Sequence, residues 1–184
     1  MVIGLVGVAA LLVIVLWGVF AYNGLVRMRQ EVKSAWSQID VQLKRRHDLI
    51  PNLVEAVKGY LAHERQTLEA VIKARTQAVS ATGLQDKAQA ETMLTQTLRS
   101  LFAVVERYPD LKASQNVQAL QEELTSTENR ISFARQFYND QAARLNTAVE
   151  SVPTNVIASS TGFAKAEFFQ LDAAEERQAP TVKF

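Results

Sequence analysis

The sequence predicts an all-α protein: an N-terminal transmembrane helix followed by an elongated antiparallel bundle of three long helices plus a short C-terminal helix. Three observations support this class. Four of the seven glycines lie in the first 24 residues, and the other 160 positions hold only three glycines and the four prolines. The rest of the chain is rich in Ala, Leu, Gln, Glu and Arg, which favour helices. Its apolar residues recur at steps of three, four and seven, the spacing of one helix face.

The first element is the apolar stretch at residues 2–21. These twenty residues carry no charge and match the thickness of a bilayer, so they predict a transmembrane helix and an anchor domain over residues 1–22. A cleaved signal peptide is the alternative, but no basic residue precedes the stretch and Tyr22-Asn23 is a poor mature start. We therefore expect an uncleaved anchor that contacts the lipid bilayer. Its large side chains are Leu5, Leu11, Leu12, Ile14, Leu16, Trp17 and Phe20.

Flanking charge predicts the orientation of this single-pass anchor in the plasma (inner) membrane. Arg27, Arg29 and Lys33 follow the apolar stretch, and no charged side chain precedes it. The positive-inside rule then places the large C-terminal domain in the cytoplasm. A periplasmic or extracellular domain is the alternative.

The long first helix of the bundle is predicted from about Leu25 to Arg75. Leu43, Ile50 and Val57 keep a seven-residue phase across Pro51, so we expect Pro51 to bend this helix without ending it. The apolar stripe comprises Leu25, Met28, Val32, Trp36, Ile39, Leu43, Ile50, Leu53, Val57, Leu61, Leu68 and Val71 or Ile72.

Two more long helices are predicted after a turn at residues 81–83. The second spans about Gln85 to Arg107 and ends before Pro109, because proline disfavours helix geometry in the preceding residue. The third runs from an N-cap at Ser114 to about Glu150.

The character of the chain changes after Pro153. Apolar side chains crowd into a short stretch, which predicts a short fourth helix that caps the bundle. These residues are Val156, Ile157, Phe163, Phe168 and Phe169. The expected helical domain therefore spans residues 23–170, and a polar tail follows at residues 171–184.

Charge is unevenly distributed along the chain. Residues 25–75 hold ten Lys or Arg against six Asp or Glu, whereas residues 76–184 hold ten against thirteen. A basic first helix packed against acidic later helices, within one chain or between chains, is the expected explanation. An acidic external partner is the alternative.

No catalytic constellation is visible. His63-Glu64 begins like a zinc-protease motif, but Thr67 stands where the second histidine is required. His47 is too distant along a helix to share an ion, so both histidines are expected at a surface or an interface. The chain has no cysteine. We predict no enzyme activity, cofactor, metal or small-molecule substrate.

The sharpest polar feature is the basic run Lys44–His47. One cluster without interleaved aromatics argues against nucleic acid binding, and roughly 35 Å of helix separates it from the bilayer. Arg46 lies on the apolar stripe, which predicts pairing with a carboxylate of a later helix, Glu122, Glu123 or Glu128. The candidate interface residues are Lys44, Arg45, Arg46, His47, Asp48, Pro51, Phe163, Phe168 and Phe169.

Several segments together resemble the LemA family. They are Tyr22-Asn23, Ala35-Trp36, the run IDVQLKRRHDLIPNLVEAVKGY with His63-Glu64, Ala74-Arg75, Tyr138-Asn139, residues 153–158 and Phe168-Phe169. The resemblance implies a membrane-attached bundle of antiparallel helices without established enzymatic activity. Some similar proteins carry a lipoprotein cysteine before the Tyr-Asn pair, which would place their domain outside the inner membrane. This chain lacks that cysteine, so we expect it to keep an uncleaved anchor.

Two functions are compatible with the sequence. The favoured one is a non-enzymatic scaffold that self-associates into a homo-oligomer at the membrane. The alternative is a membrane-tethered adaptor that binds a protein partner through the LKRRHD surface or the aromatic C-terminal end.

Overall fold

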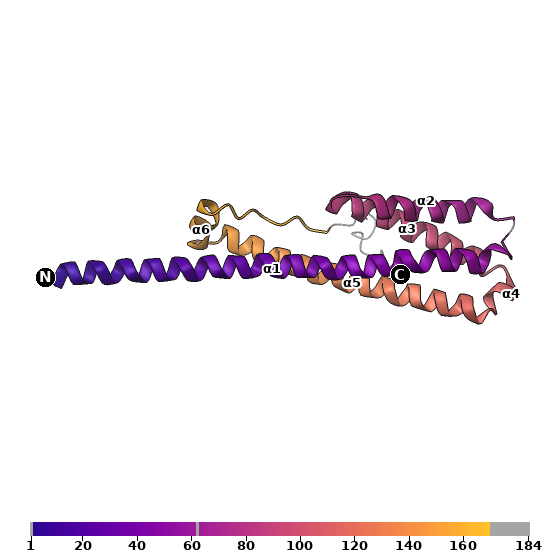
Figure 1. Ribbon diagram of the computed structural model, residues 1–184, viewed down its shortest axis with the longest axis horizontal. Coiled ribbons are helices and arrows are strands. Elements are labelled where there is room, and N and C mark those ends of the chain that lie inside the picture. Colours follow the sequence, from indigo (N-terminus) through magenta and orange to yellow (C-terminus); the bar gives the residue numbers. More distant parts are fainter. Residues whose placement is uncertain (1, 62, 170–184) are drawn as a thin grey trace, which may run out of the picture. The chain divides into compact units, whose positions relative to one another are not determined.

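The computed structural model describes residues 2–61 and 63–169, and these residues form helices without any β-strand (Figure 1). The predicted all-α class is confirmed. The helices are α1 (Val2–Lys58), α2 (Arg65–Ser80), α3 (Leu84–Val105), α4 (Pro109–Lys112), α5 (Gln115–Glu150) and α6 (Thr154–Ser160). The described residues form two compact units, one within Met1–Val41 plus Ile131–Phe168 and the other within Gln42–Arg130 plus Phe169–Phe184.

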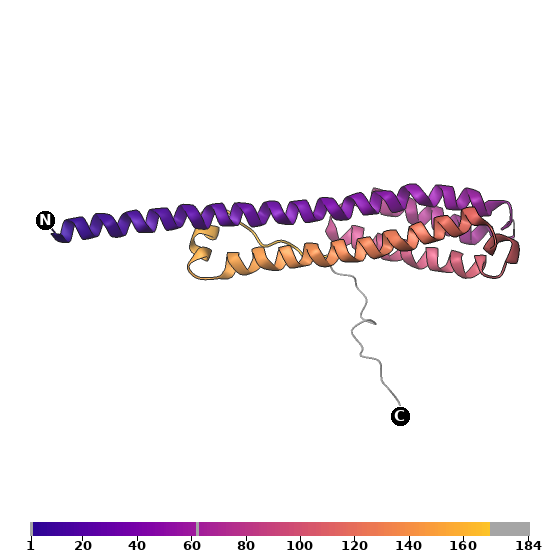
Figure 2. The ribbon, with the colours of Figure 1, turned by 90° about the horizontal axis from the view of Figure 1, so that it is seen from below.

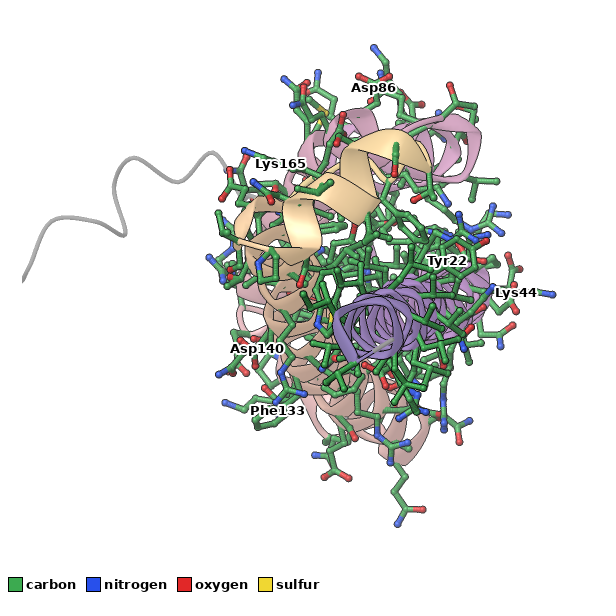
Figure 3. All side chains as sticks on the ribbon, turned by 90° about the vertical axis from the view of Figure 1, so that its left-hand side faces the viewer. Tyr22, Lys44, Asp86, Phe133, Asp140 and Lys165 are labelled. Carbon is green, nitrogen blue, oxygen red and sulfur yellow. The ribbon has the colours of Figure 1, made fainter. Side chains whose placement is uncertain are left out.

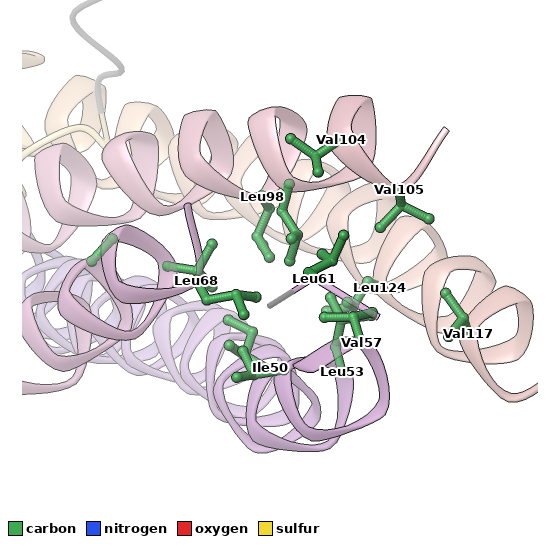
Figure 4. Packing of buried hydrophobic residues seen from close by; sticks show 14 of the residues in the cluster. Ile50, Leu53, Val57, Leu61, Leu68, Leu98, Val104, Val105, Val117 and Leu124 are labelled. Carbon is green, nitrogen blue, oxygen red and sulfur yellow. The ribbon is translucent and has the colours of Figure 1, made fainter. Parts of the chain in front are cut away.

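The unit within residues 42–130 is an up-and-down bundle in which successive long helices run in opposite directions (Figures 1 and 2). The end of α1, helices α2 and α3 and the beginning of α5 surround one apolar core. Figure 4 shows the side chains of Ile50, Leu68, Leu98 and Leu124 converging there. The apolar stripe predicted for the first helix therefore identifies the core-facing side of α1 and α2 in this unit.

The predicted helix from Leu25 to Arg75 is wrong in one respect, because the chain turns between α1 and α2. Leu61 N–H donates to Val57 O at 3.0 Å, and Glu64 N–H donates to Leu61 O at 3.0 Å. Gly59, the residue after α1, disfavours helix through its backbone entropy. Leu61 and Leu68 keep the seven-residue phase because both are buried in the same core. Periodicity alone cannot distinguish one helix from two helices that share a core.

The other helix boundaries follow the sequence closely. Helix α1 continues through Pro51, so the predicted continuity is confirmed, while the bend stays a prediction. Helix α5 begins directly after Ser114 and ends at Glu150, as expected. The single turn of α4 between α3 and α5 was not predicted.

The unit within residues 1–41 and 131–168 pairs α1 with the second half of α5, and α6 follows. Helix α6 confirms the predicted short C-terminal helix, but Phe163 and Phe168 lie beyond it in an extended segment. Gly162 adopts φ +74°, and Phe163 N–H donates to Ala158 O at 3.0 Å, the glycine-capped helix end that stops α6.

Side chains of α5 hold this extended segment in place. Tyr138 Oη donates to Glu167 O at 2.9 Å, and the Asn146 amide exchanges two hydrogen bonds with the backbone of Ala166 at 2.7 and 3.0 Å. Trp36 of α1 packs edge-on against Tyr138, with ring centroids 5.8 Å apart. Helix α1 passes residue 22 without interruption, so the boundary between anchor and bundle stays a prediction. The predicted tail at residues 171–184 lies outside the described residues.

Candidate functional site

The strongest polar cluster is centred on Arg46 of α1. Arg46 lies three residues after Leu43 and four before Ile50, so the apolar face that packs α1 also buries the guanidinium, which is 1% exposed. It forms ion pairs with Glu91 of α3 and Glu128 of α5, and donates to Thr95 Oγ1 at 3.0 Å. One side chain of α1 therefore binds to both α3 and α5. A buried cation requires such partners, because an unpaired buried charge costs several kcal/mol.

This geometry resolves the predicted pairing of Arg46. Glu128 is one of the three carboxylates expected from the sequence, and that prediction is confirmed. Glu123 instead pairs with Arg45 at 2.6 Å on the exposed surface, and Glu122 is exposed. Glu91 was missed, although it lies three residues before Leu94 and seven before Leu98. The spacing argument that placed Arg46 on the apolar stripe also applies to Glu91.

His47 of α1 lies inside the cluster, against Glu91 of α3. Its side chain is 12% exposed, and Nε2 lies 2.7 Å from Glu91 Oε1. Burial lowers the pKa of His47 from 6.5 to about 4, helped by the positive charges of Arg46, Arg75 and Lys87 and opposed by Asp48. Glu91 already balances Arg46, so the neutral ring donates to it as the Nε2–H tautomer.

Pro51 leaves a backbone acceptor in this cluster without its helical donor. An α-helix would bond the N–H of residue 51 to the carbonyl of His47, and proline has no N–H. Arg75 of α2 takes over this role, because its Nε–H donates to His47 O at 2.7 Å. A charged donor from the neighbouring helix thus compensates for a proline within α1.

The remaining residues of the predicted interface divide into buried and exposed groups. Lys44, Asp48 and Pro51 are exposed, and Figure 3 shows Lys44 pointing away from its helix. Phe168 is exposed, whereas Phe163 and Phe169 are buried. The ring of Phe163 packs edge-on against Tyr22 at 5.9 Å, and the Arg29 guanidinium lies 4.8 Å from its centroid. Phe163 therefore stabilises the fold of its own unit.

The Arg46 cluster has little capacity for chemistry. A pocket of about 190 Å³ beside it is lined by Arg46, Thr95, Leu98, Phe102 and Glu128, among others. This volume is below the roughly 300 Å³ at which small-molecule sites begin. Within residues 2–61 and 63–169, no group of three His, Asp or Glu side chains is placed to hold a metal ion. The cluster contains no nucleophile, and a histidine with a pKa near 4 is a weak base at neutral pH.

The predicted anchor occupies the first part of α1. The large side chains that define it are all exposed in the structure, from Trp17 at 38% to Leu5 at 76%. A helix that is apolar on every side, with most of this surface not covered by protein, calls for a nonpolar environment. Among the described residues, α1 is the one helix long and apolar enough to cross a membrane.

Comparison with known proteins decides the family. The family model described as LemA family matches residues 35–184. The chain belongs to the LemA family. Among related proteins, magnetosome protein MamQ 2 of Paramagnetospirillum magneticum is 28% identical, over 92% of this chain and 71% of its own length. Protein LemA of Metamycoplasma hominis is 24% identical, over 86% of this chain and 73% of its own length.

Membership in the LemA family agrees with the physical features of the chain. Magnetosome protein MamQ of Magnetospirillum gryphiswaldense is a further relative, 25% identical over 80% of this chain and 64% of its own length. None of these three relatives has a name that denotes a catalysed reaction. Family membership and the exposed apolar part of α1 together fit a membrane-associated protein.

Proposed function

We propose that this LemA-family chain is a non-enzymatic, membrane-anchored scaffold that self-associates into a homo-oligomer. The observation that carries the proposal is the use of its polar groups. The ionisable side chains of Arg46, Glu91 and His47 bind to one another inside the bundle, so this cluster holds helices together and does not present a reactive group to a substrate. The apolar part of α1 continues into this bundle without interruption, so a membrane anchor would present it directly.

An exposed aromatic pair on α5 supports self-association. Phe133 is 72% exposed and Phe137 is 44% exposed, and Figure 3 shows Phe133 pointing outward. Residues four apart lie on the same helix face, so the two rings form one apolar patch. Full burial of a phenylalanine contributes about 1.5–3 kcal/mol. Copies confined to one membrane meet at high effective concentration, which favours a second copy as the partner.

The test is crosslinking of the full chain in native membranes, followed by light scattering of detergent-solubilised protein. The wild type should form a uniform assembly, and Phe133→Gln with Phe137→Gln should reduce it to monomer. Met93→Gln, an exposed apolar residue of α3, is the matched control and should leave the assembly intact. A monomeric wild type would refute self-association. An assembly that survives the double substitution would refute this face as the interface.

A membrane-tethered adaptor is the second candidate, and the exposure of Lys44, Asp48 and Pro51 favours it. These residues remain accessible while Arg46 is sequestered, so a protein partner can reach them. A monomeric wild type, with capture of a specific partner that Lys44→Ala weakens, would support the adaptor over the scaffold.

We also propose that the anchor spans the plasma (inner) membrane once, with the bundle in the cytoplasm. Arg27, Arg29 and Lys33 on the C-terminal flank support this orientation. A periplasmic or extracellular bundle is the outcome that a topology assay must exclude.

A further inference from the structure

The turn between α5 and α6 is unusual for an exposed loop because it carries no charge. From Ser151 to Ala164 there is no Asp, Glu, Lys or Arg. The residues that flank this uncharged stretch, Glu150 and Lys165, form an ion pair with each other. We call residues 151–157 the α5–α6 tip.

The tip exposes apolar side chains. Val152 is 82% exposed and Val156 is 63% exposed, and Pro153 lies between them. Exposed aliphatic residues grouped around one turn indicate contact with something nonpolar outside the unit.

The tip lies beside the C-terminal part of the proposed membrane anchor. A methyl group added at Gly18 would lie 3.8 Å from Ile157 Cδ1, so α6 packs against α1 within the apolar stretch. Gly18 precedes the end of that stretch at Ala21 by about 4.5 Å of helix. This places α6 at the depth of the membrane interface, where amphipathic elements bury about 5–10 Å into the headgroup and acyl boundary.

Three hydroxyl groups near the tip are already hydrogen-bonded, which lowers the desolvation cost of transfer into the interface, whereas Asn155 Oδ1 is buried without a hydrogen-bond partner. Ser151 Oγ donates to Thr147 O at 2.7 Å, Ser159 Oγ donates to Val156 O at 3.1 Å, and Thr161 Oγ1 donates to Ile157 O at 2.6 Å. A hydroxyl that bonds to its own helix requires little hydration. Tyr22 and Arg29, which contact Phe163, follow the apolar stretch on its C-terminal side, where aromatic and basic residues are common at membrane interfaces.

We infer that the α5–α6 tip is a second membrane contact, with Val152 and Val156 inserted into the interface of the bilayer that α1 crosses. This inference rests on the proposed anchor. Contact at two places fixes the orientation of this unit relative to the membrane surface, which a single anchoring helix leaves free to rotate. The partner is the lipid interface itself, with no requirement for a particular headgroup.

The full chain offers a direct test because it contains no native cysteine. Single substitutions Val152→Cys and Val156→Cys are labelled with an environment-sensitive fluorophore and reconstituted in phosphatidylcholine–phosphatidylglycerol vesicles. Leu12→Cys reports on the anchor, and Gln136→Cys, exposed on α5, reports on a position facing water. Lipids carrying a nitroxide near the headgroup then quench any probe at the interface, and lipids carrying a nitroxide deep in the acyl chain quench the Leu12 probe if the anchor spans the bilayer.

Both tip probes should show blue-shifted emission and quenching by the shallow nitroxide, while the Gln136 probe shows neither. A blue shift without lipid quenching would indicate burial against another protein and would overturn the inference. Tip probes that behave like the Gln136 probe while the Leu12 probe is quenched would refute the tip contact and leave the anchor standing. An unquenched Leu12 probe would refute the anchor and, with it, the tip contact. Thermal melts of each labelled variant establish that the comparison concerns folded protein.

Discussion

Removal of the Arg75 guanidinium should destabilise the bundle more when residue 51 is proline than when residue 51 has a backbone N–H. Arg75→Ala takes away the donor that satisfies His47 O, a contact of 2.7 Å. Hydrogen bonds from charged donors contribute about 1.5–3 kcal/mol, and this one is only partly buried, so we expect a loss of about 1–2 kcal/mol. Pro51→Ala restores a backbone N–H four residues after His47. In that background Arg75→Ala should cost less by about 1 kcal/mol, because the carbonyl keeps a donor.

The assay is a double-mutant cycle measured by urea unfolding of the detergent-solubilised full chain. Pro51→Ala alone should be neutral or stabilising, since proline in a helix interior costs up to about 3 kcal/mol relative to alanine. Lys73→Ala, an exposed residue of α2, is the matched control and should show no coupling to residue 51. Equal costs of Arg75→Ala in the two backgrounds would show that Arg75 does not replace the missing helical donor.

Three further predictions concern the same chain. Between pH 4 and 6.5 the unfolded state binds the His47 proton more strongly than the folded state, so stability rises with pH. Acidification from pH 7 to 5 should therefore lower the free energy of unfolding by about 2 kcal/mol. His47→Gln should remove this pH dependence in thermal melts recorded across the same range. Arg46→Ala should cost about 3–5 kcal/mol and Lys44→Ala less than about 0.5 kcal/mol in urea unfolding, and equal costs would contradict the burial argument. The substitution Thr82→Cys should resist labelling by an impermeant maleimide in intact cells if the bundle is cytoplasmic. Ready labelling would show that the bundle lies outside the membrane. Thr82 is preferable to Gly83, because the φ of +87° at Gly83 strains other residues.

The sequence was sufficient for the helical class and most helix boundaries because the signals are local. Ser114 and Glu150 bracket α5 as predicted, and the stripe from Leu25 to Val71 supplies buried positions throughout. The turn after Lys58 was missed because Leu61 and Leu68 stay in phase across it. A seven-residue phase is preserved whenever both residues reach the same core, so it contains no information about the direction of the chain between them.

The candidate site was only partly predictable for the same reason. The pairing of Arg46 with Glu128 was predictable from spacing and charge, because the position of each residue on its own helix is enough to infer it. The contact of Arg75 with the carbonyl of His47 depends on the chain reversal. On an uninterrupted helix these residues would lie about 42 Å apart. The low pKa of His47 likewise depends first on burial of the ring and then on positive charges from α1, α2 and α3, all of which only the folded bundle brings together.

The buried ion pairs also bear on how the helices find one register. Apolar stripes with seven-residue spacing fit together in several registers that differ by whole heptads. A shift of seven residues along α3 would place Leu98 opposite Arg46 and leave Glu91 buried without its partner, which costs several kcal/mol. The Arg46 cluster therefore selects one alignment among apolar alternatives of similar energy, as buried polar residues do in coiled coils.

This reasoning separates stability from register in a single variant. Arg46→Met with Glu91→Leu and His47→Leu removes both buried charges together with the ring that binds to Glu91, and Glu128, which is partly exposed, can be hydrated. Replacement of a buried ion pair by apolar residues is often neutral or stabilising, so the melting temperature should stay close to that of the wild type. Without the charged pair, neighbouring registers become accessible, and amide resonances of α3 should broaden or double. One sharp set of resonances at unchanged stability would show that apolar packing alone fixes the register and that the buried charges have no role in choosing it.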